Sequence, residues 1–144
     1  MDFTNEMVLE FDSRSINESF ARIVVASFVA QLDPTLEEIN DIKTAVSEAV
    51  TNAIIHGYKD EIGKIKIICK TKNNEVFIEI TDTGVGIEDI EKAREPLYTS
   101  RPEIERSGMG FSFMEAFMDD LIVESKVDQG TIIKMSKVIK TSGD

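Results

Sequence analysis

The chain has 144 residues, of which 16 are basic and 27 acidic, so its formal net charge is −11. This length suits one domain, which we predict to span residues 1–139, followed by a frayed tail at 140–144. A surface this acidic repels phosphate backbones, so direct nucleic-acid binding is disfavoured. A basic protein partner and a purely solubilising role for the charge both stay open.

Neither a membrane segment nor a secretion signal is expected. No run of about 18 apolar residues occurs, as a membrane-spanning helix would require. The acidic N-terminus lacks the basic region of a signal peptide. Cys69 is the single cysteine and cannot form an intramolecular disulfide, so we predict a cytoplasmic protein with Cys69 inside a strand.

Residues 7–11 predict a first strand, and two helices follow it. The first helix runs over 15–31, with Ser15 as N-cap and Glu18 three residues later, as in a capping box. Its predicted buried stripe consists of Phe20, Ile23, Val24, Ser27, Phe28 and Leu32.

The second helix is predicted over 35–56, again with a capping-box pattern at its start. Thr35 would be its N-cap with Glu38 at the third position, and Gly57 would end it in the left-handed conformation. The predicted buried stripe consists of Ile39, Ile42, Val46, Ala49 and Ala53.

The second half of the chain reads as two hairpins separated by short helices. The predicted elements are strands 64–71 and 75–81, a helix near 88–94, an irregular stretch at 95–107, a helix at 111–117, and strands 121–125 and 131–136. This order predicts an α/β (α+β) fold: a two-layer sandwich with helices on one face of a mixed, mostly antiparallel sheet.

The first motif lies on the second helix, where Glu48, Asn52 and His56 are spaced four residues apart and therefore share one face. A carboxylate there can accept a proton, and an amide oxygen one turn away can bind Mg²⁺. A solvated helix pair would show the same spacing. The neighbouring residues are nearly all small or apolar, and that setting favours a pocket.

The second motif is Asp82-Thr83-Gly84-Val85-Gly86, which follows a strand. A carboxylate at this point can accept a hydrogen bond from an exocyclic amine such as that of adenine, and glycines let the backbone approach a ligand closely. An ordinary turn between a strand and a helix is the alternative.

The third motif, Ser107-Gly108-Met109-Gly110-Phe111, opens a helix. Free amides at a helix N-terminus attract phosphate, and Arg101 and Arg106 just before it could pair with a terminal phosphate. A flexible hinge beside a solvated run of charges would look similar.

Taken together, the three motifs resemble the N, G1 and G2 boxes of the GHKL nucleotide-binding superfamily. This superfamily has the Bergerat fold and includes gyrase, Hsp90, mismatch-repair ATPases and histidine kinases. Gly130-Thr131 resembles its late threonine, so the likeness covers residues 44–133.

A closer resemblance is to the anti-sigma F factor family of spore-forming bacteria, and it covers nearly the whole chain. It rests on residues 17–22, 25–28, 31–35, 47–58 and 105–111. The resemblance implies a serine/threonine-protein kinase that uses ATP with Mg²⁺ and forms a homodimer. It also implies that the protein sequesters a sporulation sigma factor and phosphorylates a serine of the anti-anti-sigma antagonist.

The resemblance also assigns roles to individual residues. It implies that Glu48 is the catalytic base and Asn52 the Mg²⁺ ligand, while Arg106 meets the γ-phosphate. Arg22 would contact the protein partners. The residues implied to hold adenine, or to shape the phosphate and lid turns around ATP or ADP, are Asp82, Thr131, Gly84, Gly86, Gly108, Met109, Gly110 and Phe111.

Three other functions stay open. A histidine-kinase catalytic domain would need its phosphoacceptor histidine on another protein. A nucleotide-gated binding module would use the same pocket without catalysis. An ATPase like the chaperone or topoisomerase relatives usually needs further domains.

Overall fold

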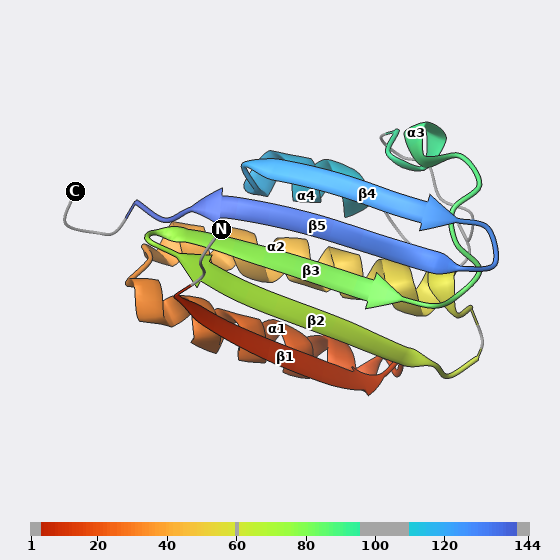
Figure 1. Cartoon of the computed structure of the whole chain (residues 1–144), viewed down its shortest axis with the longest axis horizontal. Helices are drawn as coiled ribbons and strands as arrows, with labels where there is room; N and C mark the ends of the chain where they lie inside the picture. The colour runs from red at the N-terminus through yellow and green to blue at the C-terminus, as the bar shows by residue number, and fades with distance from the viewer. Residues whose placement is uncertain (1–3, 60, 96–109, 141–144) are drawn as a thin grey trace.

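The computed structural model describes residues 4–59, 61–95 and 110–140. Their five strands form one sheet in the order β1-β2-β3-β5-β4 (Figure 1). The strands are β1 (Asn5–Asp12), β2 (Lys64–Lys72), β3 (Glu75–Asp82), β4 (Asp120–Lys126) and β5 (Gly130–Val138). Every pairing between them is antiparallel, so no parallel pair of the expected mixed sheet is present in the described strands.

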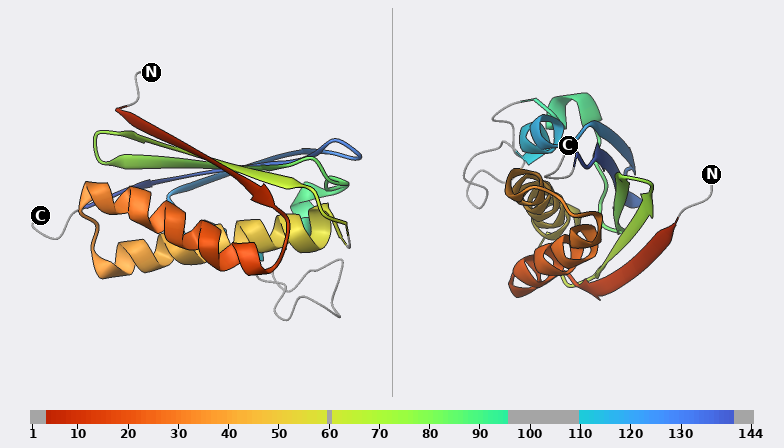
Figure 2. Two further views of the ribbon diagram at one scale, coloured as in Figure 1. Left: turned by 90° about the horizontal axis from the view of Figure 1, so that it is seen from below. Right: turned by 90° about the vertical axis from the view of Figure 1, so that its left-hand side faces the viewer.

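The helices cover one face of this sheet, as Figure 2 shows, and the predicted two-layer sandwich is confirmed. They are α1 (Ile16–Val29) with the 3₁₀ turn η1 (Ala30–Leu32), α2 (Leu36–Asn52) with the π-helical turn η2 (Ala53–Gly57), α3 (Ile90–Ala93) and α4 (Gly110–Phe117). Helix α2 lies in the middle and packs against both α1 and α4. None of the described helices is long and apolar enough to cross a membrane.

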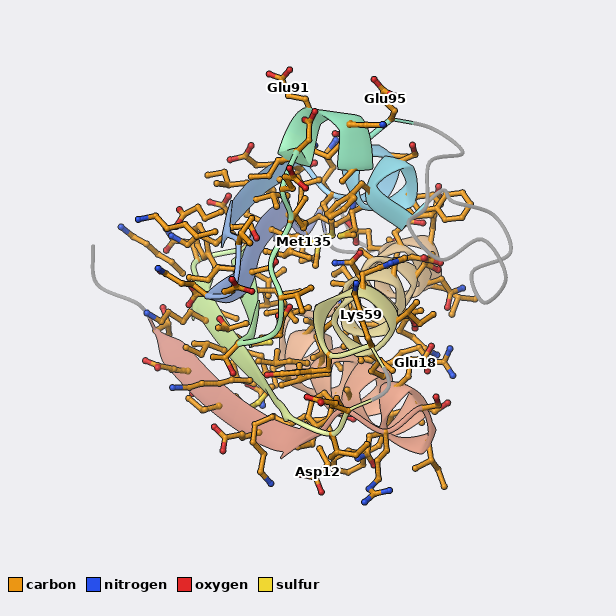
Figure 3. All side chains as sticks on the ribbon, turned by 90° about the vertical axis from the view of Figure 1, so that its right-hand side faces the viewer. Asp12, Glu18, Lys59, Glu91, Glu95 and Met135 are labelled. Carbon is orange, nitrogen blue, oxygen red and sulfur yellow. The ribbon has the colours of Figure 1, made fainter. Side chains whose placement is uncertain are left out.

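The core lies between the two layers because alternate residues of each strand face the helices. Met135 shows this position in Figure 3, between β5 and the helices. The apolar side chains that the sheet buries are Phe11, Ile65, Ile67, Cys69, Val76, Ile78, Ile80, Ile133 and Met135. Each fully buried isoleucine is worth roughly 1.5–3 kcal/mol relative to exposure. The predicted strand position of Cys69 is confirmed.

The two predicted capping boxes have opposite outcomes. At α2 the box is present: Glu38 N donates to Thr35 Oγ1 at 3.1 Å, and Thr35 N donates to Glu38 Oε1 at 2.8 Å. At α1 the prediction is wrong, because Ser15 already has helical backbone angles and its side chain makes no capping bond. The strand end is joined to α1 by Asn17 instead, whose Nδ2 donates to the Asp12 carbonyl at 2.9 Å.

The predicted buried stripe of α1 has the right period but largely the wrong face. Phe20 and Ile23 are 50% and 55% exposed. The residues that α1 buries are Ala21, Val25, Phe28 and Val29. Apolar residues recur every three or four positions on both faces of this helix. The close packing against α2 selects the face with the smaller side chains at Ala21 and Val25.

The end of α2 also differs from the prediction. Gly57 does not adopt the left-handed conformation; Lys59 does, with a φ of 55°. The helix widens into the π-helical turn before it ends, and Tyr58 N donates to the Ala53 carbonyl at 2.9 Å. A Cβ on Gly57 would lie 2.9 Å from Asp82 Oδ1, so any larger residue at this position would displace the Asp82 carboxylate.

Candidate functional site

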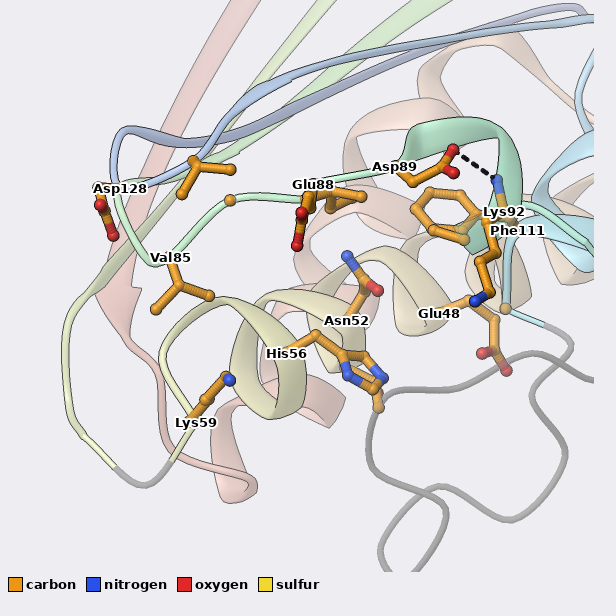
Figure 4. A pocket seen from close by; sticks show the side chains of 16 residues that line it. Glu48, Asn52, His56, Lys59, Val85, Glu88, Asp89, Lys92, Phe111 and Asp128 are labelled. Atoms are coloured by element: carbon orange, nitrogen blue, oxygen red, sulfur yellow. Dashed lines mark hydrogen bonds between the residues drawn. The ribbon is translucent and has the colours of Figure 1, made fainter.

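A cavity of about 570 Å³ opens where the end of α2 meets the segment after β3, α3 and the start of α4 (Figure 4). Its lining comes from parts of the chain that are far apart in sequence. The residues are Glu48, Thr51, Asn52, His56, Lys59, Val85, Gly86, Ile87, Glu88, Asp89, Lys92, Ala93, Gly110, Phe111, Val127 and Asp128. Residues of all three predicted motifs therefore meet at one cavity.

Helix α2 supplies Glu48 and Asn52, and the following turn η2 supplies His56; the three side chains are half-buried and four residues apart. Their buried neighbours Ala49 and Ala53 anchor the opposite side of α2 in the core. The predicted common face of the three polar residues is thus the face that lines the cavity. Figure 4 shows Asn52 pointing from α2 toward Glu88 on the opposite wall.

Asp82 does not itself line the cavity but lies directly behind its wall, against Gly57 between the lining residues His56 and Lys59, and it is 5% exposed. Its Oδ1 accepts a hydrogen bond from Gly84 N at 2.9 Å. Burial raises the pKa of this carboxyl, while the backbone N–H groups of Gly84 and Thr131 partly lower it. A buried carboxylate that accepts few hydrogen bonds from the protein is a strong acceptor for a ligand's N–H group.

Two glycines bring the end of α2 against the turn that follows Asp82. Val85 N donates to the Gly57 carbonyl at 2.8 Å. A Cβ on Gly84 would lie only 2.0 Å from that same carbonyl oxygen. The first and second motifs are therefore joined backbone to backbone.

Tyr58 strengthens this junction. Its hydroxyl donates to the Lys64 carbonyl, and Thr83 N donates to the hydroxyl at 2.8 Å. The side chain thus connects the residue after η2 to the start of β2 and the end of β3. Sequence reasoning missed Tyr58, because its partners are identified only by the fold.

Thr131 pairs with Asp82 across β5 and β3, and it is 3% exposed. The preceding Gly130 has a φ of 97°, and a Cβ there would lie 2.0 Å from the Asp82 carbonyl oxygen. Only glycine fits at this crossing. Ser125 on β4 lies against Thr131, with 2.8 Å between the two hydroxyl oxygens.

Carboxylates outnumber lysines around the cavity. Among the described residues, Glu48, Glu88, Asp89 and Asp128 line the cavity together with two lysines, Lys59 and Lys92. In Figure 4 the two lysines lie at opposite ends of the cavity. Asp89 also caps α3, since its Oδ1 accepts from Lys92 N at 3.1 Å. A polyphosphate entering here would need a cation to offset the negative charge.

The described residues contain no group of three or more His, Cys, Asp or Glu side chains that could hold a metal ion. The Asn52 amide and the Glu48 carboxylate are nevertheless hard oxygen donors at the same cavity. Mg²⁺ keeps several waters and uses few protein ligands beside substrate phosphates, so this donor set fits Mg²⁺ bound together with a nucleotide.

The residues predicted from the sequence divide into four groups. Those lining the cavity are Glu48, Asn52, Gly86, Gly110 and Phe111, and those beside it are Asp82, Gly84 and Thr131. Arg22 lies on α1, where its Nη2 donates to Ser19 Oγ at 3.4 Å. Arg106, Gly108 and Met109 lie outside the described residues.

Sequence reasoning assigned no role in the site to Lys59, Glu88, Asp89, Lys92 or Asp128, which all line the cavity. Position along the chain could have indicated Glu88, Asp89 and Lys92, since they directly follow the glycine turn. Lys59 and Asp128 carry no such signal, and the fold alone brings them there.

Known proteins support the nucleotide site. The family model described as "Histidine kinase-like ATPase domain" matches residues 11–137. An anti-sigma F factor of Clostridium botulinum (strain Eklund 17B / Type B) is 63% identical over 94% of this chain and 95% of its own. The anti-sigma F factor of Thermoanaerobacter sp. (strain X514) is 61% identical over 96% of this chain and 97% of its own.

The fold is also found in a crystal structure of the RsbU and RsbW domains of a Mycobacterium tuberculosis protein. The TM-score is 0.67 at 18% sequence identity, over 94% of this chain and 32% of that one. This likeness concerns the fold alone. The family match and the near full-length identities, together with the cavity, lead to one conclusion: the chain belongs to the anti-sigma F factor family, and its fold is a histidine kinase-like ATP-binding domain.

Proposed function

We propose that this protein is an ATP-dependent anti-sigma factor, that residues 1–139 form its single functional domain, and that it acts in the cytoplasm as a homodimer. It sequesters a sporulation sigma factor and phosphorylates a serine of the antagonist of that complex, an anti-anti-sigma protein. One observation carries the proposal: Glu48 and Asn52 share a face of α2 inside a cavity beside the buried carboxylate of Asp82.

The chain's own residues would divide the work as follows. Asp82 and Thr131 receive the adenine, because a buried carboxylate and a hydroxyl side by side can accept from its exocyclic amine. The glycine turn at Gly84 and Gly86 lets the backbone approach the nucleotide. Glu48 takes the proton from the attacking serine hydroxyl, as a general base does.

Asn52 would hold Mg²⁺ together with the phosphate oxygens and water. When bound, the ion offsets charge on the polyphosphate. This need is strong here because Glu88, Asp89 and Asp128 also face the cavity. Arg106, with Gly108 and Met109, would complete the phosphate side, while Gly110 and Phe111 close the cavity at the start of α4.

One side of helix α1 has the character of a surface that binds a protein partner. Ile16, Phe20 and Ile23 are spaced along one side of it and are 80%, 50% and 55% exposed. Arg22 lies next to this apolar stripe, with a side chain that is 35% exposed. Exposed apolar surface beside an arginine is typical of protein interfaces, so we assign this side of α1 to the sigma factor and its antagonist.

The kinase proposal is tested by incubating the protein with γ-labelled ATP and the anti-anti-sigma protein of the same organism. Wild type should transfer label to an acid-stable phosphoserine. Glu48→Gln should lose transfer by about 10²-fold or more while keeping ATP affinity within a few-fold. The matched control is Glu91→Gln, since Glu91 on α3 points away from the molecule in Figure 3.

Each outcome has a distinct meaning. Full transfer by Glu48→Gln would remove Glu48 from the reaction. ATP-dependent capture of the sigma factor by wild type without any transfer would instead favour a nucleotide-gated binding module, which the exposed stripe on α1 would serve equally well.

A further inference from the structure

A row of three polar side chains crosses the inner face of the sheet at one end. Asp82, Thr131 and Ser125 come from β3, β5 and β4, and each is the register partner of the next. Most of the other residues on this face are apolar, and the exceptions, Thr71 on β2 and Lys137 on β5, lie at the opposite end of their strands. Asp82 and Thr131 are almost fully buried, so their polar atoms need hydrogen-bond partners from the protein around them or from a ligand.

The Ser125 hydroxyl makes three contacts. Its oxygen lies 2.9 Å from the Gly130 carbonyl and 2.8 Å from Thr131 Oγ1, and it accepts from Ile87 N at 2.7 Å. A carbonyl can only accept, and a serine hydroxyl has one proton. One arrangement makes all three contacts hydrogen bonds: Ser125 donates to Gly130, and Thr131 donates to Ser125.

This arrangement uses the only side-chain proton of Thr131. Its oxygen can then offer lone pairs but no proton to a ligand. The neighbouring Asp82 carboxylate also only accepts when ionised, and its Oδ1 already accepts from Gly84 N. Two adjacent acceptors favour a base that brings N–H donors and disfavour one that brings a carbonyl oxygen.

We propose that Ser125 is a positioning residue that fixes the Thr131 hydroxyl as an acceptor, so that the site selects a nucleobase with an exocyclic amine over one with a carbonyl at that position. This inference rests on the proposed nucleotide site. Ser125 also binds the backbone of Ile87, which lines the cavity, so the selecting row is fixed relative to the cavity wall.

The test compares ATP with ITP, which carries a carbonyl in place of the amine, by calorimetric titration of the intact protein with Mg²⁺. Wild type should prefer ATP. In Ser125→Ala the freed Thr131 hydroxyl can donate to the carbonyl. ITP should therefore bind more tightly than to wild type, and the ATP-to-ITP ratio should fall by about tenfold.

Structural damage would weaken both nucleotides and could not improve ITP. Ser125→Thr keeps a hydroxyl and should restore the wild-type ratio, and Ser136→Ala on the other face of β5 is the matched control. Thr131→Val, which keeps the backbone N–H and removes the acceptor, should also lower the ratio and is informative even if Ser125→Ala does not fold.

An unchanged ratio in folded Ser125→Ala, or in Thr131→Val, would overturn the inference and leave the proposed function intact. Failure of wild type to bind either nucleotide would overturn the proposed function itself.

Discussion

Replacing Gly84 by alanine tests the junction between the end of α2 and the turn after Asp82. Gly84 does not have a positive φ, so alanine meets no backbone strain there. The difficulty is space, because the new Cβ would lie 2.0 Å from the Gly57 carbonyl oxygen. Real Cβ atoms essentially never approach within 3.0 Å, so the two segments must separate by about 1 Å.

That separation would break two hydrogen bonds at once. Val85 N donates to the Gly57 carbonyl at 2.8 Å, and Gly84 N donates to Asp82 Oδ1 at 2.9 Å. Each buried group left without a partner costs about 1–3 kcal/mol, so we expect a loss of about 3 kcal/mol in the free energy of unfolding. For a chain of this length, that corresponds to a fall in Tm of roughly 10 °C.

The assay is thermal unfolding followed by circular dichroism, with nucleotide titration of the folded variant. ATP affinity should fall as well, because the displaced turn carries the Asp82 carboxylate with it. Val85→Ala is the control for the unfolding measurement alone: its side chain lines the cavity, but it is 39% exposed and its backbone N–H is retained. A Tm within 1–2 °C of wild type for Gly84→Ala would refute the close approach of Gly84 to the Gly57 carbonyl oxygen.

Three further predictions concern single side chains. Thr35→Ala should lower the free energy of unfolding by about 1 kcal/mol, because it removes the bond from Glu38 N at the start of α2; an unchanged denaturant midpoint would contradict this. Burial raises the pKa of the Cys69 thiol to about 12, so a thiol reagent at about pH 8 should label only unfolded protein, and fast labelling of the native state would count against the buried strand position. Burial also raises the pKa of Asp82 above its ordinary 3.8, so the folded state binds this proton more tightly than the unfolded state does. Its contribution to stability is complete below that ordinary pKa and is lost as pH rises through the folded pKa. Nucleotide-free wild type should therefore lose more stability than Asp82→Asn as the pH rises above that ordinary pKa, and parallel pH profiles would exclude the effect.

The sequence allowed the sheet to be predicted well because its signals are local. Alternation of apolar and polar residues, broken at Ile68 and Phe77, identifies β2 and β3, and the two residues Asn73 and Asn74 between them form the turn. The common face of Glu48 and Asn52 follows from helix geometry alone. Each of these inferences needs only residues that are close together in the chain.

The predictions were wrong where two different structures fit the same local sequence pattern. Helix α1 has apolar residues on two faces, and only its packing against α2 decides that Val25 is buried and Phe20 exposed. Likewise, Ser15 and Glu18 have the spacing of a capping box, but the backbone at Ser15 is already helical. Tyr58 and Ser125 could not be identified in advance, because the partners that matter lie far away in the chain: Thr83 is 25 residues from Tyr58, and Ile87 is 38 residues from Ser125. The contact between Ser125 and Thr131 depends on the register of β4 and β5.

The π-helical turn explains how the backbone at the end of the first motif bonds directly to the backbone of the second. A helix ordinarily leaves its last carbonyls unpaired. Here the wider turn lets Tyr58 N bond the Ala53 carbonyl, and the Gly57 carbonyl accepts from Val85 N in the glycine turn. The end of α2 is thus satisfied by the segment that follows Asp82. Because this bond joins backbone atoms, the spacing between the end of α2 and Asp82 depends on the absence of side chains at Gly57 and Gly84.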